Sequence, residues 1–229
     1  MIDFIDHITN YASLLKSGSV WHDSTEVLAP VLGDDDNDPA MNDYIYEFYC
    51  YLSVIVDLKT NYELKFVEGD GEYKFNFPRK AAPKKGKPLF HAFESGKLAF
   101  QICAGTMINC DYQREKNHPD ISFQLADASD DPTEEDLIII MDAKFTENHK
   151  SRLSKTEFYK FGGITDVFDL RGKPKTIIKF NKLADMFGNC LITNGRAYAD
   201  PTDLKLSKRW AIKEVEHFSP GNRKISVIG

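Results

Sequence analysis

Three charged residues stand at the ends of two predicted strands, where their types and spacing suit catalysis. Asp120 opens the segment "PDISFQL", and Asp142 and Lys144 close the apolar run "LIIIMDAK". Because side chains alternate along a strand, Asp142 and Lys144 are expected on one face, with Ala143 pointing away. Buried charges are costly unless they are paired or bound to a metal ion, so a compensating partner is expected at this place.

A divalent metal ion would compensate both carboxylates. Carboxylate and carbonyl oxygens are the ligands that Mg²⁺ prefers, so Asp120, Asp142 and the backbone carbonyl of Ala143 form a suitable set, with waters completing the shell. Lys144 would lie beside one such water, where it could orient or help deprotonate it, or stabilise charge on a pentacovalent phosphate. The alternative is structural: two surface aspartates and an ion pair from Lys144 at a strand end.

The elements that must position these residues are predicted from periodicity and turn signals. "NDYIYEFYCYLSVIVDLKT" predicts a packed helix, since apolar residues occupy nearly all of its faces and Glu47 is its only charge between Asp43 and Asp57. Strand-like segments follow, and the turn "EGDGE" predicts that "YELKFVEG" and "EYKFNFP" pair as an antiparallel hairpin. "KPLFHAF" and "GKLAFQICAGTMI" are predicted strands as well.

After the two strands of the candidate site, "SKTE" (154–157) is a capping box for a helix that ends near Gly162. A further helix is expected near "KFNKLADMFG", a strand at "NCLITNG", a longer helix from about Thr202 through "LKLSKRWAIKEVEHF", and an edge strand at "KISVIG". This order predicts an α/β fold with a mixed central sheet flanked by helices.

The dipeptide "PD", followed 22 positions later by "DAK" at the end of an apolar strand, resembles the motif of the PD-(D/E)xK nuclease superfamily, which is restriction endonuclease-like. The resemblance covers residues 40 to 195 and implies an α-β-β-β-α-β core whose last strand is "NCLITNGR". It also implies Mg²⁺-dependent or Mn²⁺-dependent hydrolysis of DNA, with Asp120, Asp142 and Lys144 as the catalytic site. Glu47 matches the acidic residue of the first helix that often joins the metal site, although a glutamate at the wet rim of a buried helix is common.

The resemblance carries further expectations about organisation and partners. Residues 1–40 would be an N-terminal helical extension, and residues 41–229 the nuclease domain with a C-terminal helix and an edge strand. Cutting both strands of DNA requires two sites, which implies a homodimer or a subunit of a larger complex, as in restriction or antiviral defence systems. Two alternatives stay open: a catalytically inactive nuclease-fold module that binds nucleic acid or a protein partner, and a structural subunit.

Basic residues that follow the candidate site are expected to contact DNA phosphates: Arg152, Lys155, Lys160 and Arg196. Net charge is −6, which argues weakly against a general nucleic-acid binder, but residues 171–229 carry 12 Lys and Arg against 5 Asp and Glu. The run "RKAAPKKGK" (79–87) is a second basic cluster and a candidate flap over the site. Solvated lysine-rich faces are the alternative for each cluster.

Cysteine usage and hydropathy favour a cytoplasmic protein. The four cysteines form no CxxC pair and lie in apolar contexts, which is typical of buried free thiols in a reducing compartment. The apolar runs are too short to span a bilayer, and the first residues lack the basic region of a secretory signal. The six histidines are scattered and form no zinc pattern, so the metal expectation stays with the carboxylates.

Overall fold

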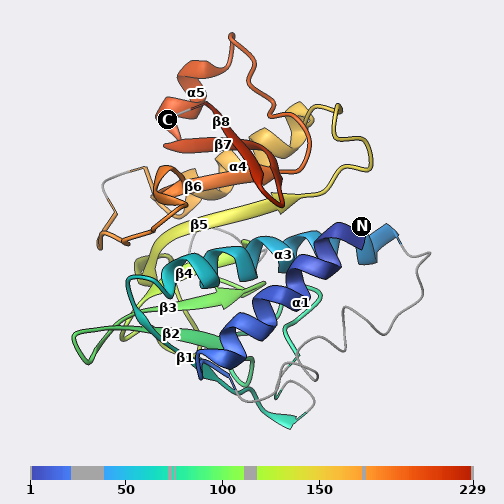
Figure 1. The fold of residues 1–229 in the computed structure, drawn as a ribbon. Helices are drawn as coiled ribbons and strands as arrows, with labels where there is room; N and C mark the ends of the chain where they lie inside the picture. The colour runs from blue at the N-terminus through green and yellow to red at the C-terminus, as the bar shows by residue number, and fades with distance from the viewer. Residues whose placement is uncertain are drawn as a thin grey trace.

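A computed structural model describes residues 2–21, 39–71, 74, 76–110, 118–171 and 174–227. Within these residues, one eight-stranded sheet forms the centre of the molecule, and its strand order follows the chain from β1 to β8 (Figure 1). The first five strands pair antiparallel with their neighbours, β5, β6 and β7 run parallel, and β8 returns antiparallel. The sheet is therefore mixed, as the sequence predicts.

The candidate site lies at the ends of two of the eight strands. The strands are β1 (Glu63–Val67), β2 (Leu89–Glu94), β3 (Lys97–Ala104), β4 (Ile121–Leu125), β5 (Leu137–Lys144), β6 (Asn189–Thr193), β7 (Ile212–Ser219) and β8 (Asn222–Val227). β5 is a central strand, and every residue from Leu137 to Ala143 is buried. Burial on both faces explains why this segment reads as a continuous apolar run rather than an alternating one.

Helices cover both faces of the sheet. On one side lie α1 (Ile2–Ser17) and α3 (Pro39–Leu58), which pack on each other and share a core cluster with Ile139, Met141 and Ala143 of β5. On the other side α4 (Lys155–Val167) packs over Leu137 and Ile140. The short α5 (Leu204–Arg209) precedes β7 (Figure 1). No helix among the described residues is both long and apolar enough to cross a membrane.

Because α3 lies between α1 and the sheet, it is buried on nearly every side. Phe4 of α1 packs edge-on against Tyr46 and Tyr49, with ring centroids 5.4 and 4.9 Å apart. Aromatic contacts of this kind add to the stability that area burial supplies. The predicted packed helix is confirmed, and residues of α1 belong to the same core cluster as those of α3.

The structure bears on two further local predictions. β1 pairs with β2, whereas residues 72, 73 and 75 of "EYKFNFP" lie outside the described residues, so the expected hairpin between "YELKFVEG" and "EYKFNFP" stays a prediction. The predicted cap of α4 is confirmed, since the Ser154 hydroxyl accepts the Glu157 N–H at 3.2 Å. The helix nevertheless continues past Gly162 to Val167. Gly162 serves close packing there, because a Cβ would lie 2.1 Å from the Trp210 ring.

The helix predicted from about Thr202 forms only in part, because its continuation through "IKEVEHF" is wrong. Helical structure is limited to the six residues of α5, and the segment "IKEVEHFS" forms strand β7, parallel to β6. The two glutamates that resemble a polar helix face are buried: Glu214 accepts the N–H groups of Tyr198 and Ala199, and Glu216 accepts that of Ala197. Near "KFNKLADMFG" only a 3₁₀ turn forms, at Ala184–Met186. The predicted edge strand is confirmed as β8.

Candidate metal centre

Adjacent strands bring the three predicted residues to one end of the sheet. Asp120 directly precedes β4, whereas Asp142 and Lys144 are the antepenultimate and last residues of β5. The antiparallel register pairs Ile121 with Met141, so the next pair along the ladder places Asp120 opposite Asp142. Chain positions far apart in sequence are therefore neighbours here because of strand pairing.

The side chains converge on the ammonium group of Lys144. Its Nζ lies 2.9 Å from Oδ2 of Asp142 and 3.6 Å from Oδ2 of Asp120. Asp142 and Lys144 share a face as predicted, while Ala143 points into the core and is 2% exposed. The Ala143 N–H donates to Oδ2 of Asp120 at 2.7 Å, which fixes that carboxylate against β5. Both carboxylate side chains are 12% exposed and Lys144 is 28% exposed, so the cluster is half-buried and opens at the lysine.

Burial and mutual repulsion shape the charges of this cluster. Burial, and then the charge of Asp142, raises the pKa of Asp120 well above its usual value, although Lys144 opposes the shift. Burial alone would lower the pKa of Lys144, but Asp142 and Asp120 outweigh it and raise that pKa on balance. In this arrangement Lys144 is an ammonium ion. It is therefore suited to orienting a water molecule or stabilising negative charge, rather than to accepting a proton.

Glu47 approaches the cluster from α3. Burial raises its pKa to about 7, with smaller contributions from Asp142 and Asp43, while Lys144 acts in the opposite direction. Glu47 and Asp120 line the same small cavity, of about 90 Å³, together with His118. Within the described ranges no three acidic, histidine or cysteine side chains converge into a ready-made metal cluster. Direct ligation by Glu47 thus stays a prediction.

The basic residues predicted to contact DNA divide into two groups. Lys155 pairs with Asp203 at 3.4 Å and Lys160 pairs with Glu157 at 3.1 Å, so their charges are partly neutralised on α4. Arg152 and Arg196 are exposed and lie side by side, because their segments form an isolated β-bridge. These two arginines are the stronger candidates for phosphate contacts.

Asn194 holds the loops of these arginines together. Its Oδ1 accepts the Thr146 N–H at 2.7 Å, and its Nδ2 donates to the Thr146 carbonyl at 2.8 Å. Thr193, the residue before it, pairs with Lys144 in the parallel register. The loops that follow β5 and β6 are therefore joined immediately beyond the candidate site, at the edge where ligands usually bind in α/β sheets.

The basic segment 79–87 is packed against the body of the protein. Lys84 is 3% exposed, and its Nζ donates to the carbonyls of Ala128 and Ser129 at 3.0 and 2.9 Å. The Arg79 guanidinium lies 5.7 Å from the centre of the Tyr44 ring, and Arg79 and Lys80 line the cavity beside Glu47 and Asp120. Lys84 is thus a structural residue, whereas Arg79 and Lys80 border the candidate site.

Two residues near the candidate site were not predicted from the sequence to take part in it. Asp43 lies one helical turn before Glu47, and its charge adds to the raised pKa of that residue. The spacing of four residues on a helix is the signal that identifies this pair. Asn194 follows a predicted strand, but its partner at Thr146 is 48 residues away and only strand pairing brings the two together.

Comparison of the chain with protein-family models, curated proteins and solved structures finds no match. Similarity therefore does not place the chain in a family, and membership of the PD-(D/E)xK superfamily stays a prediction from the motif.

Proposed function

We propose that this protein is a metal-dependent nuclease of the PD-(D/E)xK type that hydrolyses phosphodiester bonds in DNA. The observation that carries the proposal is the convergence of Asp120, Asp142 and Lys144, with the lysine Nζ 3.6 and 2.9 Å from the two carboxylates. Five strands, β1 to β5, separate α3 from α4, and β6 follows α4. This order is compatible with the α-β-β-β-α-β core that the resemblance implies, if β3, β4 and β5 are its three strands and β1 and β2 are additions.

The donor set suits a hard divalent cation. The side chains of Asp120 and Asp142 are only 12% exposed, and burial, followed by repulsion from Asp142, raises the pKa of Asp120, so a bound cation would relieve an unfavourable arrangement. The Ala143 carbonyl and Glu47 offer further oxygen ligands. Mg²⁺ or Mn²⁺, when bound, polarises the scissile phosphate and lowers the pKa of a coordinated water.

The chain's own residues would then position the substrate and stabilise charge. Lys144, held as an ammonium by the two aspartates, lies where it can orient the attacking water and stabilise the extra negative charge on phosphorus. Arg152 and Arg196 would hold the DNA backbone through its phosphates, which gives an affinity that falls with salt concentration.

Cleavage of supercoiled plasmid in Mg²⁺, with EDTA as the metal-free control, tests the proposal. Asp142→Asn and Lys144→Met should each lower the cleavage rate by ~100-fold or more, since each removes a charge at the reacting phosphate. Asp127→Asn is the matched control, because Asp127 is exposed in the turn after β4. It should cleave at the wild-type rate, and thermal melting of all variants checks that they fold.

The same assay separates the alternatives. Retarded migration of DNA without cleavage in Mg²⁺ or Mn²⁺ would favour the inactive nuclease-fold module that binds nucleic acid. A protein that neither binds nor cleaves DNA would favour a structural subunit. Full activity in Asp142→Asn would overturn the assignment of the metal centre even if the wild-type protein cleaves.

A further inference from the structure

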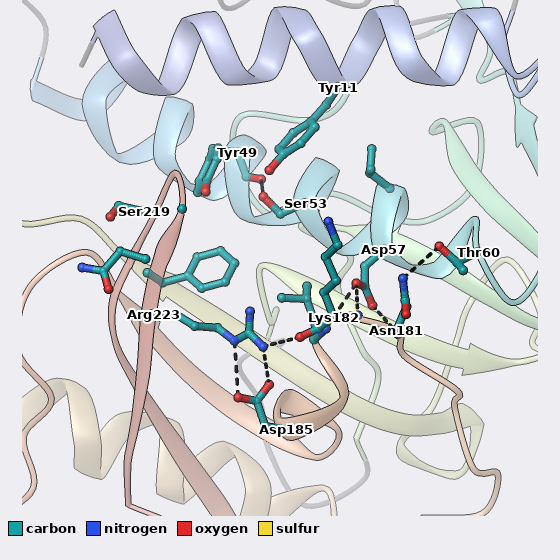
Figure 2. A pocket seen from close by; sticks show the side chains of 15 residues that line it. Tyr11, Tyr49, Ser53, Asp57, Thr60, Asn181, Lys182, Asp185, Ser219 and Arg223 are labelled. Atoms are coloured by element: carbon teal, nitrogen blue, oxygen red, sulfur yellow. Dashed lines mark hydrogen bonds and ion pairs between the residues drawn. The ribbon is translucent and has the colours of Figure 1, made fainter.

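A second, larger groove lies along α3 on the side opposite the candidate metal centre. It has a volume of about 630 Å³ and runs between α1, α3, the segment 181–185 and the turn joining β7 to β8 (Figure 2). Tyr49 and Ser53 of α3 line this groove, whereas Tyr44 and Glu47 of the same helix line the cavity beside Asp120. At 100° per residue these two pairs occupy opposite faces of the helix, so the groove is a separate site.

Two cations face this groove. The side chain of Lys182 extends into it toward Ser53, and among the described residues its ammonium forms no ion pair (Figure 2). The Arg223 guanidinium is held by Asp185, which accepts from Nε at 3.3 Å and from Nη2 at 3.0 Å, and Nη2 also donates to the Lys182 carbonyl. These contacts leave Nη1 as a donor in a fixed position.

The acidic groups of the groove are already engaged. Asp57 is 8% exposed, and its carboxylate accepts the N–H groups of Asn181, Lys182 and Leu183 at 2.7, 2.7 and 3.2 Å. It thereby fixes the loop that presents Lys182. Asp185 is occupied by Arg223. The formal charges of these four groups sum to zero, but the carboxylates are already hydrogen-bonded, whereas the Lys182 ammonium and Nη1 of Arg223 remain available as donors, which favours an anionic ligand.

Aromatic rings form the opposite wall. The rings of Tyr11 and Tyr49 are stacked, with centroids 6.1 Å apart and planes at 24°, and Phe218 lies 5.8 Å from Tyr49. Figure 2 shows Tyr11 extending from α1 toward α3, where Tyr49 lies. Tyr49 and Phe218 are only 2% and 4% exposed and support the partly exposed ring of Tyr11 from the core side. The Tyr11 ring suits packing of a planar heterocycle, and the adjoining cations suit a phosphate.

We propose that this groove binds a nucleoside phosphate. The base of this ligand packs on the ring of Tyr11, and its phosphate lies between the ammonium of Lys182 and Nη1 of Arg223. The groove does not share residues with the cluster of Asp120, Asp142 and Lys144, so the inference stands apart from the proposed nuclease activity.

Isothermal titration of the full chain in EDTA tests this inference, with the four nucleoside 5′-monophosphates, inorganic phosphate and adenosine as probes. At least one nucleoside monophosphate should bind ~10-fold or more tightly than inorganic phosphate and than adenosine. Inorganic phosphate lacks the base that packs on the aromatic ring, and adenosine lacks the phosphate that contacts the two cations. Lys182→Ala should weaken that binding by ~10-fold. Lys205→Ala, which removes an exposed lysine of α5, should leave it unchanged.

A second variant tests the packing of the base on the Tyr11 ring. Tyr11→Leu keeps apolar bulk but removes the aromatic face, and it should weaken the monophosphate while leaving inorganic phosphate unaffected. Asp142→Asn should bind like the wild type, which distinguishes the groove from the candidate metal centre. The inference is overturned if no monophosphate binds saturably, or if Lys182→Ala and Lys205→Ala bind alike.

Discussion

Replacing Glu47 with glutamine should stabilise the protein above neutral pH when divalent metal is removed. Burial, with help from Asp142 and Asp43, raises the pKa of Glu47 from 4.5 to about 7. Between these values the folded state holds a proton that the unfolded state has released, so wild-type stability falls as pH rises through this window. Glutamine resembles the protonated acid at every pH and does not incur this loss.

The magnitude follows from the two pKa values. Their difference corresponds to about 3 kcal/mol of unfolding free energy. The attraction between ionised Glu47 and Lys144 is already contained in the pKa of about 7, so we expect Glu47→Gln to gain about 3 kcal/mol near pH 8. Near pH 4, where the acid is protonated in both states, the two proteins should be equally stable.

Urea denaturation in EDTA, followed by tryptophan fluorescence across the pH range, measures this difference. Glu135→Gln is the control, because Glu135 is exposed and should not change the pH profile relative to the wild type. Equal stability of Glu47→Gln and the wild type near pH 8 would refute this reasoning. It would mean that burying the ionised Glu47 carboxylate does not lower the unfolding free energy. A trade between stability and activity is common at functional sites.

Three further predictions concern packing and charge. Lys144→Met leaves two carboxylates without their counter-ion and should lower the unfolding free energy by about 1 to 3 kcal/mol near pH 8, measured by urea denaturation in EDTA. Asn194→Ala removes three side-chain hydrogen bonds with Thr146 and should lower the unfolding free energy by about 1 to 3 kcal/mol, with faster amide exchange at Thr146. Gly162→Ala places a Cβ 2.1 Å from the Trp210 ring and should lower the unfolding free energy by about 1 to 3 kcal/mol, seen as a lower melting temperature. Gly163→Ala meets no atom within 4 Å and should be neutral or stabilising, so equal melting of the two alanine variants would contradict the packing.

The candidate site could be predicted because its geometry is local to two strands. Alternation along β5 is enough to place Asp142 and Lys144 together, and a strand beginning at Asp120 needs only to pair with β5 to complete the cluster. The extended apolar run of β5 also identifies it as a central strand. These features are short-range consequences of strand geometry.

The errors arise where tertiary contacts decide the structure. The segment that forms β7 carries glutamates in a pattern typical of a polar helix face, yet their carboxylates are buried against N–H groups of residues 197–199. Gly162 reads as a helix stop but accommodates Trp210, 48 positions later. Lys84 reads as part of a mobile basic cluster but donates to carbonyls beyond β4. No local pattern reveals partners at such separations.

The most direct test of the central claim is a titration of the protein with Mn²⁺, followed by electron paramagnetic resonance. The wild-type protein should bind Mn²⁺ saturably, Asp142→Asn should bind it at least ~10-fold more weakly, and Asp127→Asn should bind like the wild type. Equal binding of Mn²⁺ by the wild type and Asp142→Asn would contradict the assignment of Asp120 and Asp142 to a shared metal site.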